Sequence, residues 1–335
     1  MTQTVLYPED RQIPDEEIER EVYRGELEIV RRHAKSLAEI SDKDCAAADG
    51  LMVMRFAVGA EDLARFPRLK VIVRMGVGYD KLPREAAAAR GILICNVPDY
   101  GTTEVADHAM ALALALRRGI VLYHERMRQT PMPWGPVKGE LVRRSGVQSF
   151  GIVGLGRIGT AVALRARAFG FRVLFYDPYL PNGAELALGI ARARSLDDLL
   201  RESDTLSIHT PLTPETRHLL GHRELSLLPK GAVVVNTARG PIVDIDALLA
   251  LLRQGHLAGA GLDVLPIEPP AEPYPEILAA YRAREEGLEG RLIITPHAAW
   301  FTPQSEADTR KKSAETMRAA LLTNRPQNVI TPEMF

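Results

Sequence analysis

A glycine-rich segment near the middle of the chain, residues 151–159, constrains the fold more than any other part of the sequence. It follows an apolar run that begins at Val147 and precedes a helical pattern that ends near Gly170. Three glycines stand in the spacing G-x-G-x-x-G, namely Gly154, Gly156 and Gly159. They allow a tight bend, the approach of a phosphate to bare backbone, and close packing of helix on strand. The segment therefore predicts a strand, an anion-binding turn, and a helix whose amino terminus faces the anion.

The residues around this turn predict which anion it binds. A second apolar run, Val173 to Tyr176, leads to Asp177, about 20 residues beyond the glycines. A carboxylate at this point of a βαβ unit accepts hydrogen bonds from a ribose and repels a 2′-phosphate. Arg157 and Ile158 stand in the first helical turn, where they would lie beside the phosphates. We therefore predict NAD rather than NADP; the alternative is a glycine-rich turn followed by a surface acid.

Composition limits the classes of protein to consider. The chain has 335 residues, of which 46% are hydrophobic and 25% charged, so it is long enough for two domains with ample cores. Its formal net charge of −1 gives no general attraction to nucleic acid or to an anionic membrane. We expect no secretory signal and no membrane span, because no stretch has the required apolar length and flanks. Cys45 and Cys95 show no metal or redox spacing, which favours a cytoplasmic setting.

The first part of the chain predicts a small parallel-sheet domain. Apolar runs alternate with helical stretches there: strands over 5–7, 51–54, 71–73 and 92–95, and helices over 14–23 and 83–90. After the third run, Gly76 to Gly78 offers bare amides at a strand's carboxyl end, where a carboxylate could bind. A tight connection between strand and helix is the alternative interpretation.

A turn-rich break over residues 96–101 predicts a hinge. Thr103 is the expected cap of a following helix that runs to about Arg118. That helix is apolar around much of its circumference, which favours burial both by its own domain and by a second subunit. The segment from Tyr123 to Arg144 contains three prolines and is expected to form an irregular arm.

The rest of the chain predicts a six-stranded dinucleotide-binding sheet. Beyond the two strands named above, further runs lie at 205–209, 232–236, 260–264 and 292–295, separated by helices near 196–201, 225–228 and 246–254. Asp244 and Gly255 are the start and stop signals of the last of these helices. A long insertion over 266–291 and a helix over 303–322 complete the chain.

The predicted fold is thus α/β, with two parallel-sheet domains, Rossmann-like and flavodoxin-like, and a cleft between them. The expected boundaries are 1–98 plus 301–335 for a substrate-binding domain and 99–300 for the NAD-binding domain inserted into it.

The segments that follow the later strands of the predicted sheet are rich in polar side chains. Their residues are His209, Thr210 and Pro211; Thr237, Ala238 and Arg239; Asp263 and Glu268; and His297. Ligands of open parallel sheets bind at the carboxyl ends of the strands, so we expect these residues at one edge with the glycine turn.

An arginine, a carboxylate and a histidine near a nicotinamide indicate hydride exchange with a 2-oxo or 2-hydroxy acid. Arg239 offers a planar fork of donors for the substrate carboxylate and for polarising the adjacent carbonyl. His297 would act as general acid or base, and Glu268 would fix its tautomer and favour its protonated form. Taken singly, Arg239 could form a surface ion pair and Glu268 could be solvated. A metal site at His209, His218 and His222 lacks supporting cysteines or carboxylates, so we predict no metal.

Several segments together resemble the D-isomer-specific 2-hydroxyacid dehydrogenase family over nearly the whole chain. They are residues 154–159, Tyr176-Asp177-Pro178, residues 209–213, residues 236–240, residues 261–264 with Glu268-Pro269, and Thr295-Pro296-His297. The resemblance implies Arg239, Glu268 and His297 as the catalytic set. It also implies a dimer with a mobile cleft.

The resemblance further implies several binding roles. The implied cofactor contacts, beyond the glycine turn and Asp177, are His209, Thr210, Pro211, Thr237, Ala238, Asp263 and Val105. On the substrate side, Val77 and Gly78 would present amides to the carboxylate, with Tyr100, Arg239 and Trp300 also in contact.

Within the family, the sequence His297-Ala298-Ala299-Trp300 is similar to the C-terminal-binding protein branch, which includes NAD-sensing corepressors. Trp300 would form an apolar wall beside His297, or would simply pack at a domain junction. The 266–291 loop is longer than the family minimum, and the chain stops at Phe335 without the extended tail or regulatory domain of some members. We therefore expect a cytoplasmic, homodimeric NAD-dependent enzyme acting on a small 2-oxo or 2-hydroxy acid. The alternatives are an NAD-sensing binding protein with weak catalysis and, less favoured, a decarboxylating or formate-type hydride donor.

Overall fold

The computed structural model describes residues 2–9, 15–323 and 325–334. The chain folds into two compact units, each built on its own sheet. Unit 1 comprises the residues up to Gly101 together with those from Phe301 onward, and unit 2 runs from Thr102 to Trp300. Within the part of the chain that the structure describes, no helix combines the length and apolarity needed to cross a bilayer.

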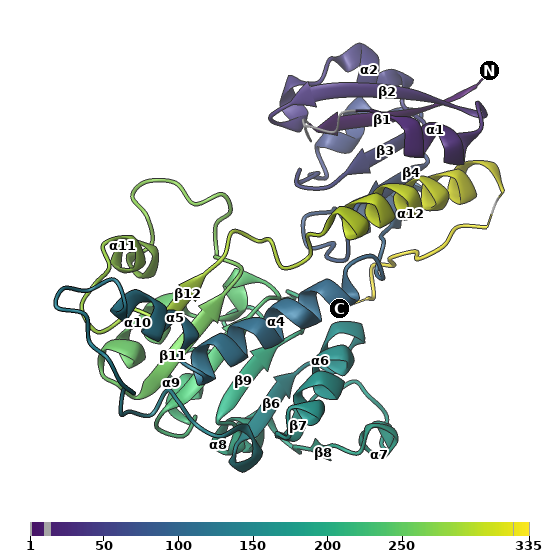
Figure 1. Cartoon of the computed structure of the whole chain (residues 1–335). Helices are drawn as coiled ribbons and strands as arrows, with labels where there is room; N and C mark the ends of the chain where they lie inside the picture. The colour runs from purple at the N-terminus through teal and green to yellow at the C-terminus, as the bar shows by residue number, and fades with distance from the viewer. Residues whose placement is uncertain (1, 10–14, 324, 335) are drawn as a thin grey trace. The chain divides into compact units, whose positions relative to one another are not determined.

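Unit 1 contains a five-stranded sheet in the order β2-β1-β3-β4-β5 (Figure 1). The strands are β1 (Gln3–Glu9), β2 (Leu27–Ala34), β3 (Gly50–Val53), β4 (Val71–Arg74) and β5 (Leu93–Cys95). All neighbouring strands are parallel, and the order 2-1-3-4-5 is that of the flavodoxin-like doubly wound sheet. The predicted fold class is therefore confirmed for this unit.

The helices of unit 1 cover both faces of its sheet. They are α1 (Glu17–Tyr23), α2 (Asp42–Ala47), α3 (Arg84–Ala89) and α12 (Pro303–Leu322), with short 3₁₀ turns at Leu37–Glu39 and Asp62–Arg65. α12 packs against α1, β3 and β4, so the end of the chain completes the domain that its beginning started. Pro14, the expected start of the first helix, lies outside the described residues.

β2 was not among the predicted strands. Its sequence carries Arg31, Arg32 and His33 in succession, and the strand lies at the edge of the sheet, where only β1 pairs with it. An edge strand needs no continuous apolar run, and charged side chains there discourage pairing with other chains. The apolar periodicity used for the prediction was consequently absent.

Unit 2 contains a seven-stranded parallel sheet in the order β12-β11-β10-β9-β6-β7-β8 (Figure 1). The strands are β6 (Ser149–Val153), β7 (Arg172–Tyr176), β8 (Ala191–Arg192), β9 (Thr205–Ile208), β10 (Ala232–Asn236), β11 (Leu257–Leu262) and β12 (Leu292–Ile294). From β8 the order reads 3-2-1-4-5-6-7, so it reverses between β6 and β9. That reversal is the switch point at which doubly wound sheets bind ligands.

Helices lie on both faces of the second sheet. They are α4 (Thr102–Arg117), α5 (Ile120–Arg126), α6 (Arg157–Ala168), α7 (Ala184–Leu188), α8 (Leu196–Glu202), α9 (His222–Ser226), α10 (Ile245–Arg253) and α11 (Glu276–Arg282), with 3₁₀ turns at Ser145–Val147 and Gly240–Ile242. One core joins α4 and α6 to the sheet, and a second joins α8, α9 and α10 to its other face. Asp244 caps α10 as predicted, because its carboxylate accepts from the backbone N–H of Asp246 and Ala247 at 3.0 Å.

Several predicted elements of unit 2 need correction. The sheet has seven strands rather than six, because the two-residue β8 is too short to show a pattern. Thr103 does not cap α4: the helix already includes Thr102, and the Thr103 hydroxyl donates to the Glu104 carboxylate at 2.8 Å. The arm expected over 123–144 begins as helix α5, which starts after Gly119 takes a left-handed φ of 64°. The insertion over 266–291 contains α11, which begins directly after Pro275.

Candidate active site

The glycine turn joins β6 to α6 at the switch point of the second sheet. A Cβ on Gly154, which has φ +87°, would lie 3.0 Å from the backbone of His209 and Thr210, and one on Gly159 would lie 2.1 Å from the Gly154 carbonyl oxygen. Both positions therefore require glycine. Gly156 differs, because a Cβ there would meet nothing within 4 Å. Its exposed backbone leaves the open approach that a pyrophosphate needs.

The amino terminus of α6 provides the donors for such an anion. Gly156 is its N-cap and supplies no side-chain cap, and the Gly156 carbonyl accepts its helical bond from Thr160. The N–H groups of the first turn, including those of Arg157 and Ile158, precede the first i→i−4 donor and have no partner within the helix. Bare N–H groups and the helix dipole together favour a phosphate at this point.

Asp177 lies at the end of β7, beside the glycine turn. One carboxylate oxygen accepts from the N–H of Leu155 at 2.9 Å, and the other accepts from the N–H of Tyr179 at 3.0 Å. Arg192 braces the same loop, because its guanidinium donates to the carbonyls of Asp177 and Pro181 at 3.3 and 2.7 Å. The acid is thus held at the position from which a ribose would be bound.

The segment after β9 lies under the glycine turn. His209 donates its backbone N–H to the Val153 carbonyl at 2.8 Å, and its ring Nε2 lies 2.8 Å from the Ser207 hydroxyl. Burial of the ring lowers the pKa of His209 to about 3, so the ring is neutral at physiological pH. Beyond Thr210, the Pro211 carbonyl accepts from the Thr216 hydroxyl at 2.6 Å. These bonds fix the backbone on which the glycine turn rests.

The segment after β10 is shaped by Asn236, which the sequence analysis did not single out. Its side-chain amide donates to the Arg239 carbonyl at 2.9 Å, and its oxygen accepts from the Ala238 N–H at 3.0 Å. The Thr237 hydroxyl is buried and has no hydrogen-bond partner in the described structure. A buried polar atom without a partner at a ligand-binding edge is the kind of group that a bound molecule satisfies.

Gly240 explains how Arg239 is brought to the next strand. A Cβ on Gly240 would lie 2.0 Å from the backbone carbon of Leu265, so the turn after β10 packs directly on the loop after β11. The Arg239 guanidinium donates to the Ala238 carbonyl at 2.8 Å, and its charge acts on the Glu268 carboxylate. Two residues 29 positions apart are therefore held near one another by the absence of one side chain.

Glu268 and His297 form a direct pair. His297 Nδ1 lies 2.6 Å from Glu268 Oε2, and Glu268 Oε1 accepts from the Leu265 N–H at 2.8 Å. Burial opposes ionisation of Glu268, but the His297 bond and charge, the Leu265 N–H and Arg239 outweigh it and hold the pKa of Glu268 below its ordinary value. The pair therefore survives as the pH falls past the ordinary pKa of a glutamate, and it is lost only below the lowered one.

Hydrogen bonds to Asp263 hold the loop that carries His297. His297 has a left-handed backbone, with φ 54°, and its N–H donates to the Asp263 carbonyl at 2.7 Å. With Nδ1 committed to Glu268, Nε2 is the ring atom that remains for a substrate. The Asp263 side chain is only 1% exposed and accepts hydrogen bonds from this loop. The cofactor contact that the resemblance implies for Asp263 stays a prediction.

The remaining predicted residues lie as follows. In unit 1, Val77 is exposed, and its carbonyl accepts from the side chain of the buried Asn96 at 2.7 Å; Gly78 is half-buried, and Tyr100 is buried. In unit 2, Val105 on α4 and Trp300 at the end of the His297 loop are both half-buried. The structure brings together Arg239, Glu268 and His297 within unit 2. Among the described residues, no cluster of three or more histidines, cysteines or acids could hold a metal.

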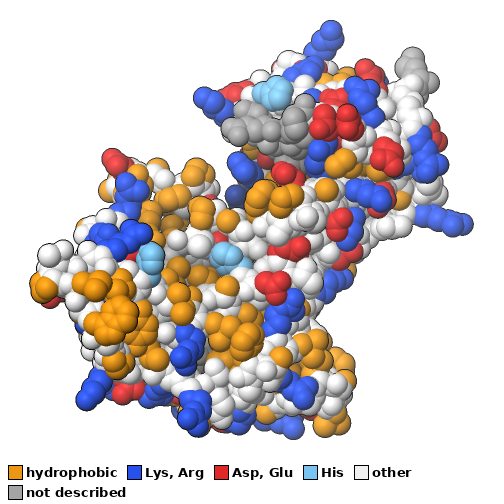
Figure 2. Space-filling view, in the orientation of Figure 1, with side chains coloured by type: hydrophobic (Ala, Val, Ile, Leu, Met, Phe, Trp, Pro, Cys, Tyr) orange, Lys and Arg blue, Asp and Glu red, His pale blue; other side chains and the backbone are white. Residues whose placement is uncertain are grey.

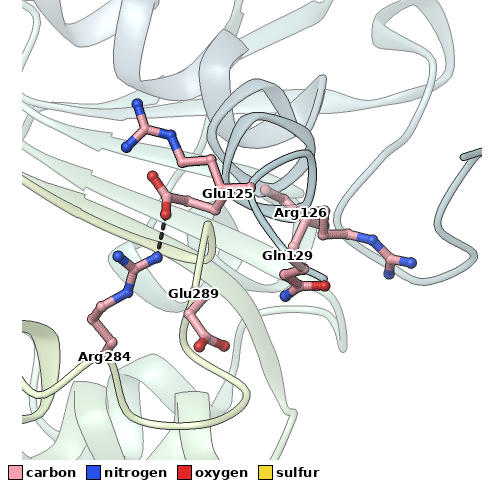
Figure 3. A pocket seen from close by; sticks show the side chains of 7 residues that line it. Glu125, Arg126, Gln129, Arg284 and Glu289 are labelled. Atoms are coloured by element: carbon pink, nitrogen blue, oxygen red, sulfur yellow. Dashed lines mark hydrogen bonds and ion pairs between the residues drawn. The ribbon is translucent and has the colours of Figure 1, made fainter. Parts of the chain in front are cut away.

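A separate hollow of about 320 Å³ lies away from this edge of the sheet. Figure 3 shows it between α5 and the loop that precedes β12, with Glu125 and Arg284 joined in an ion pair. A Cβ on Gly290 would collide with Leu122, so the loop packs tightly against α5 beside the hollow. Its lining contains none of the predicted site residues.

Comparison with known proteins identifies the family to which this geometry belongs. Residues 110–299 match the model of the D-isomer specific 2-hydroxyacid dehydrogenase, NAD binding domain. A glyoxylate reductase from Aeropyrum pernix is 35% identical over 334 residues, covering 95% of this chain and 96% of that protein.

Two solved structures are similar over nearly their whole lengths. D-lactate dehydrogenase from Aquifex aeolicus, complexed with NAD and lactic acid, aligns with a TM-score of 0.80 and 28% identity over 95% of each chain. An NADPH-dependent glyoxylate/hydroxypyruvate reductase from Sinorhizobium meliloti, in complex with NADP and malonate, aligns with a TM-score of 0.84 and 28% identity, covering 98% of this chain and 97% of that one.

The residues present fit the cofactor of the matched domain. The open backbone at Gly156, the first-turn donors of α6 and the Thr237 hydroxyl all lie at the carboxyl edge of the sheet of unit 2. Most of that unit falls within the matched NAD-binding domain. The chain belongs to the D-isomer-specific 2-hydroxyacid dehydrogenase family.

Proposed function

We propose that the protein is an NAD(H)-dependent oxidoreductase that interconverts a small 2-oxo acid and its D-2-hydroxy acid. The observation that carries this proposal is the bond of 2.6 Å between His297 Nδ1 and Glu268 Oε2 beside Arg239. Such a pair supplies a proton donor whose orientation is set by a carboxylate. A positioned proton donor of this kind suits the reduction of a carbonyl.

His297 acts as the general acid in the reducing direction. NADH, held by the glycine turn and the amino terminus of α6, would supply the hydride for the carbonyl carbon. His297 Nε2 gives its proton to the carbonyl oxygen, and Glu268 stabilises the imidazolium before transfer and keeps the Nδ1 proton in place afterward. In the oxidising direction, Nε2 takes the proton of the alcohol. Glu268 thus acts through His297 rather than on the substrate.

Arg239 binds the carboxylate of the substrate. Its guanidinium matches a carboxylate with two parallel N–H donors, and the same charge polarises the adjacent carbonyl. We propose Val77, Gly78 and Tyr100 as substrate-binding residues of unit 1, and Trp300 as one of unit 2. Unit 1 then serves as the substrate-binding domain, with boundaries near 98 and 301. Because the relatives named above include glyoxylate reductases, we propose glyoxylate as the first substrate to test.

A panel of 2-oxo acids with NADH tests this function. Glyoxylate, hydroxypyruvate and pyruvate differ only in the group attached to the oxo carbon, so their kcat/KM values measure the size and polarity that the site accepts. NADH oxidation with at least one of them is expected. The alternative is an NAD-sensing binding protein, as in the C-terminal-binding protein branch that residues 297–300 resemble. Tight NADH binding with no turnover of any oxo acid would favour that alternative.

Asp177 is expected to select NADH over NADPH. Its carboxylate is fixed by Leu155 and Tyr179, so a 2′-phosphate would meet a negative charge that cannot turn away. Asp177→Ala should therefore raise the KM for NADH and lower the preference for NADH over NADPH by about 10-fold or more, as expected for removal of one close charge repulsion. The ratio of kcat/KM values for the two cofactors measures this. Asp197→Ala, which alters a surface acid on α8, is the control, and an unchanged ratio in Asp177→Ala would assign the choice to another group.

We further propose that the protein is a homodimer in a cytoplasmic setting. Most of the apolar residues of α4 that suggested a partner are already buried in the single chain, namely Ala106, Ala109, Met110, Leu112, Ala113 and Leu116. Support comes instead from the following segment: Met132 and Trp134 are 57% and 85% exposed, and the arm lies against α5 through a bond of 3.3 Å from the Val137 N–H to the Tyr123 hydroxyl. Figure 2 shows hydrophobic side chains gathered over the end of unit 2 where α5 lies. A patch of this kind is typical of subunit interfaces.

Trp134→Ser is expected to weaken this dimer about 10-fold or more, since exposed aromatic residues dominate the energetics of interfaces. Sedimentation velocity over a range of concentrations measures the change. Leu186→Ser on α7, which is equally exposed, should leave the dimer intact. A monomeric wild-type protein, or a dimer insensitive to Trp134, would overturn the proposal.

A further inference from the structure

A chain of hydrogen bonds links helix α4 to the loop that carries His297. His108 Nε2 lies 3.0 Å from the Thr295 hydroxyl oxygen, and that hydroxyl donates to Asp263 Oδ1 at 2.6 Å. The His108 ring nitrogen is itself 3.8 Å from the same carboxylate oxygen. All three residues lie in unit 2, on α4, after β12 and after β11 respectively.

The chemistry of these groups determines the direction of each bond. A threonine hydroxyl has one proton, and at 2.6 Å it is given to the acceptor-only carboxylate of Asp263. The Thr295 oxygen must then accept from His108, so Nε2 of His108 carries a proton. The chain therefore runs in one direction, from the His108 N–H through the Thr295 hydroxyl to the carboxylate.

Asp263 in turn hydrogen-bonds the loop that carries His297. Its Oδ1 also accepts from the N–H of Ala298, and its Oδ2 accepts from the N–H of Ala299, both at 2.9 Å. These two amides follow His297 directly, and the Asp263 carbonyl accepts from the His297 N–H itself. Asp263 thus holds three consecutive residues: its main-chain carbonyl holds the left-handed His297, and its carboxylate holds the two amides that follow.

We propose that His108 and Thr295 are positioning residues that hold the Asp263 carboxylate in the rotamer required to place His297. Without the Thr295 hydroxyl, Asp263 Oδ1 loses a charge-assisted bond, and the two loop amides alone orient the carboxylate. The loop amides then lose their fixed acceptor, and Nε2 of His297 moves relative to the substrate. A displacement of about 1 Å at a catalytic group costs on the order of 10²-fold in rate. The catalytic consequence rests on the function proposed above; the positioning itself does not.

Thr295→Val and Thr295→Ser form the matched pair that tests this. Valine has the shape of threonine without the hydroxyl, and serine restores the hydroxyl without the methyl group. We expect Thr295→Val to lower kcat with glyoxylate and NADH by about 10-fold to 100-fold, while the Kd of NADH, measured by fluorescence, stays within about twofold. Thr295→Ser should recover most of the lost kcat. His108→Phe, which keeps a ring but removes the donor, should give a smaller loss in the same direction.

Hydrogen exchange supplies a readout that does not depend on turnover. The amides of Ala298 and Ala299, followed by mass spectrometry of the peptide that spans them, should exchange faster in Thr295→Val than in the wild type and Thr295→Ser. Thr309→Val is the control, because that buried threonine of α12 donates only to the Ser305 carbonyl of its own helix. Unchanged exchange in Thr295→Val, or a serine variant as impaired as the valine variant, would overturn the inference. A wild-type protein that turns over no oxo acid would instead overturn the proposed function, and the exchange data would still decide the positioning role.

Discussion

Replacing His297 by alanine should lower kcat for 2-oxo acid reduction by about 10²-fold to 10⁴-fold, the range that general acid catalysis contributes. The variant lacks the imidazole ring that we propose gives a proton to the carbonyl oxygen. The Kd of NADH should change by less than about threefold, because the glycine turn and α6 are untouched. Steady-state kinetics and NADH fluorescence titration measure the two effects separately.

Two further measurements sharpen the result for His297. Free imidazole in the buffer should restore part of the rate of His297→Ala, since it can enter the space of the missing ring and donate a proton. His222→Ala, which removes an exposed histidine on α9, should have wild-type kinetics. Full activity in His297→Ala would show that another group supplies the proton, and the mechanism would have to be abandoned.

Replacing Arg239 by alanine should lower kcat/KM for the 2-oxo acid with a smaller effect on NADH binding. Loss of one partner of a hydrogen-bonded charge pair costs about 2–5 kcal/mol, which corresponds to about 30-fold to several thousand-fold. Arg239→Lys keeps the charge but loses the planar fork, so its kcat/KM should fall between those of the wild type and the alanine variant. The same kinetics, carried out at fixed saturating NADH, measure this order.

Arg172 offers the control for this experiment. It lies at the start of β7, the opposite end of the strand from the site, and forms an exposed ion pair with Glu202 at 2.9 Å. Arg172→Ala should leave kcat/KM unchanged. If Arg239→Ala altered only the affinity for NADH, its assignment to the substrate carboxylate would be wrong.

The features of unit 2 that were predicted correctly from the sequence depend on residues that lie close together in the chain. The turn at residues 154–159 needs glycine for reasons that act within a few residues, and Asp244 caps α10 through its own backbone neighbours. By contrast, β2 and β8 lack an apolar pattern because one lies at an edge and the other is two residues long. Such strands exist through pairing with the preceding strand of the chain, β1 for β2 and β7 for β8, and not through an apolar pattern of their own.

The proposed catalytic residues show the same contrast between local and tertiary information. Arg239, Glu268 and His297 could be chosen from the sequence because each follows a predicted strand of one parallel sheet, and parallel strands end at a common edge. A bond between Glu268 and His297 was expected from their chemistry, but the order of the three residues along the edge could not be chosen this way. The proximity of Arg239 to Glu268 depends on Gly240, whose missing side chain allows the turn after β10 to rest on the backbone at Leu265.

The sequence by itself thus determined the two doubly wound sheets, the nucleotide turn and the candidates for catalysis, because period, glycine spacing and strand ends are local properties. The tertiary structure gave the expected bond between His297 and Glu268 its geometry, and it alone decided that Asp263 holds this loop and that His108 of α4 reaches it through Thr295. These contacts join residues 29 to 187 positions apart, over which no sequence pattern repeats. Their geometry follows from how close two backbones can approach and which buried polar groups must find a partner.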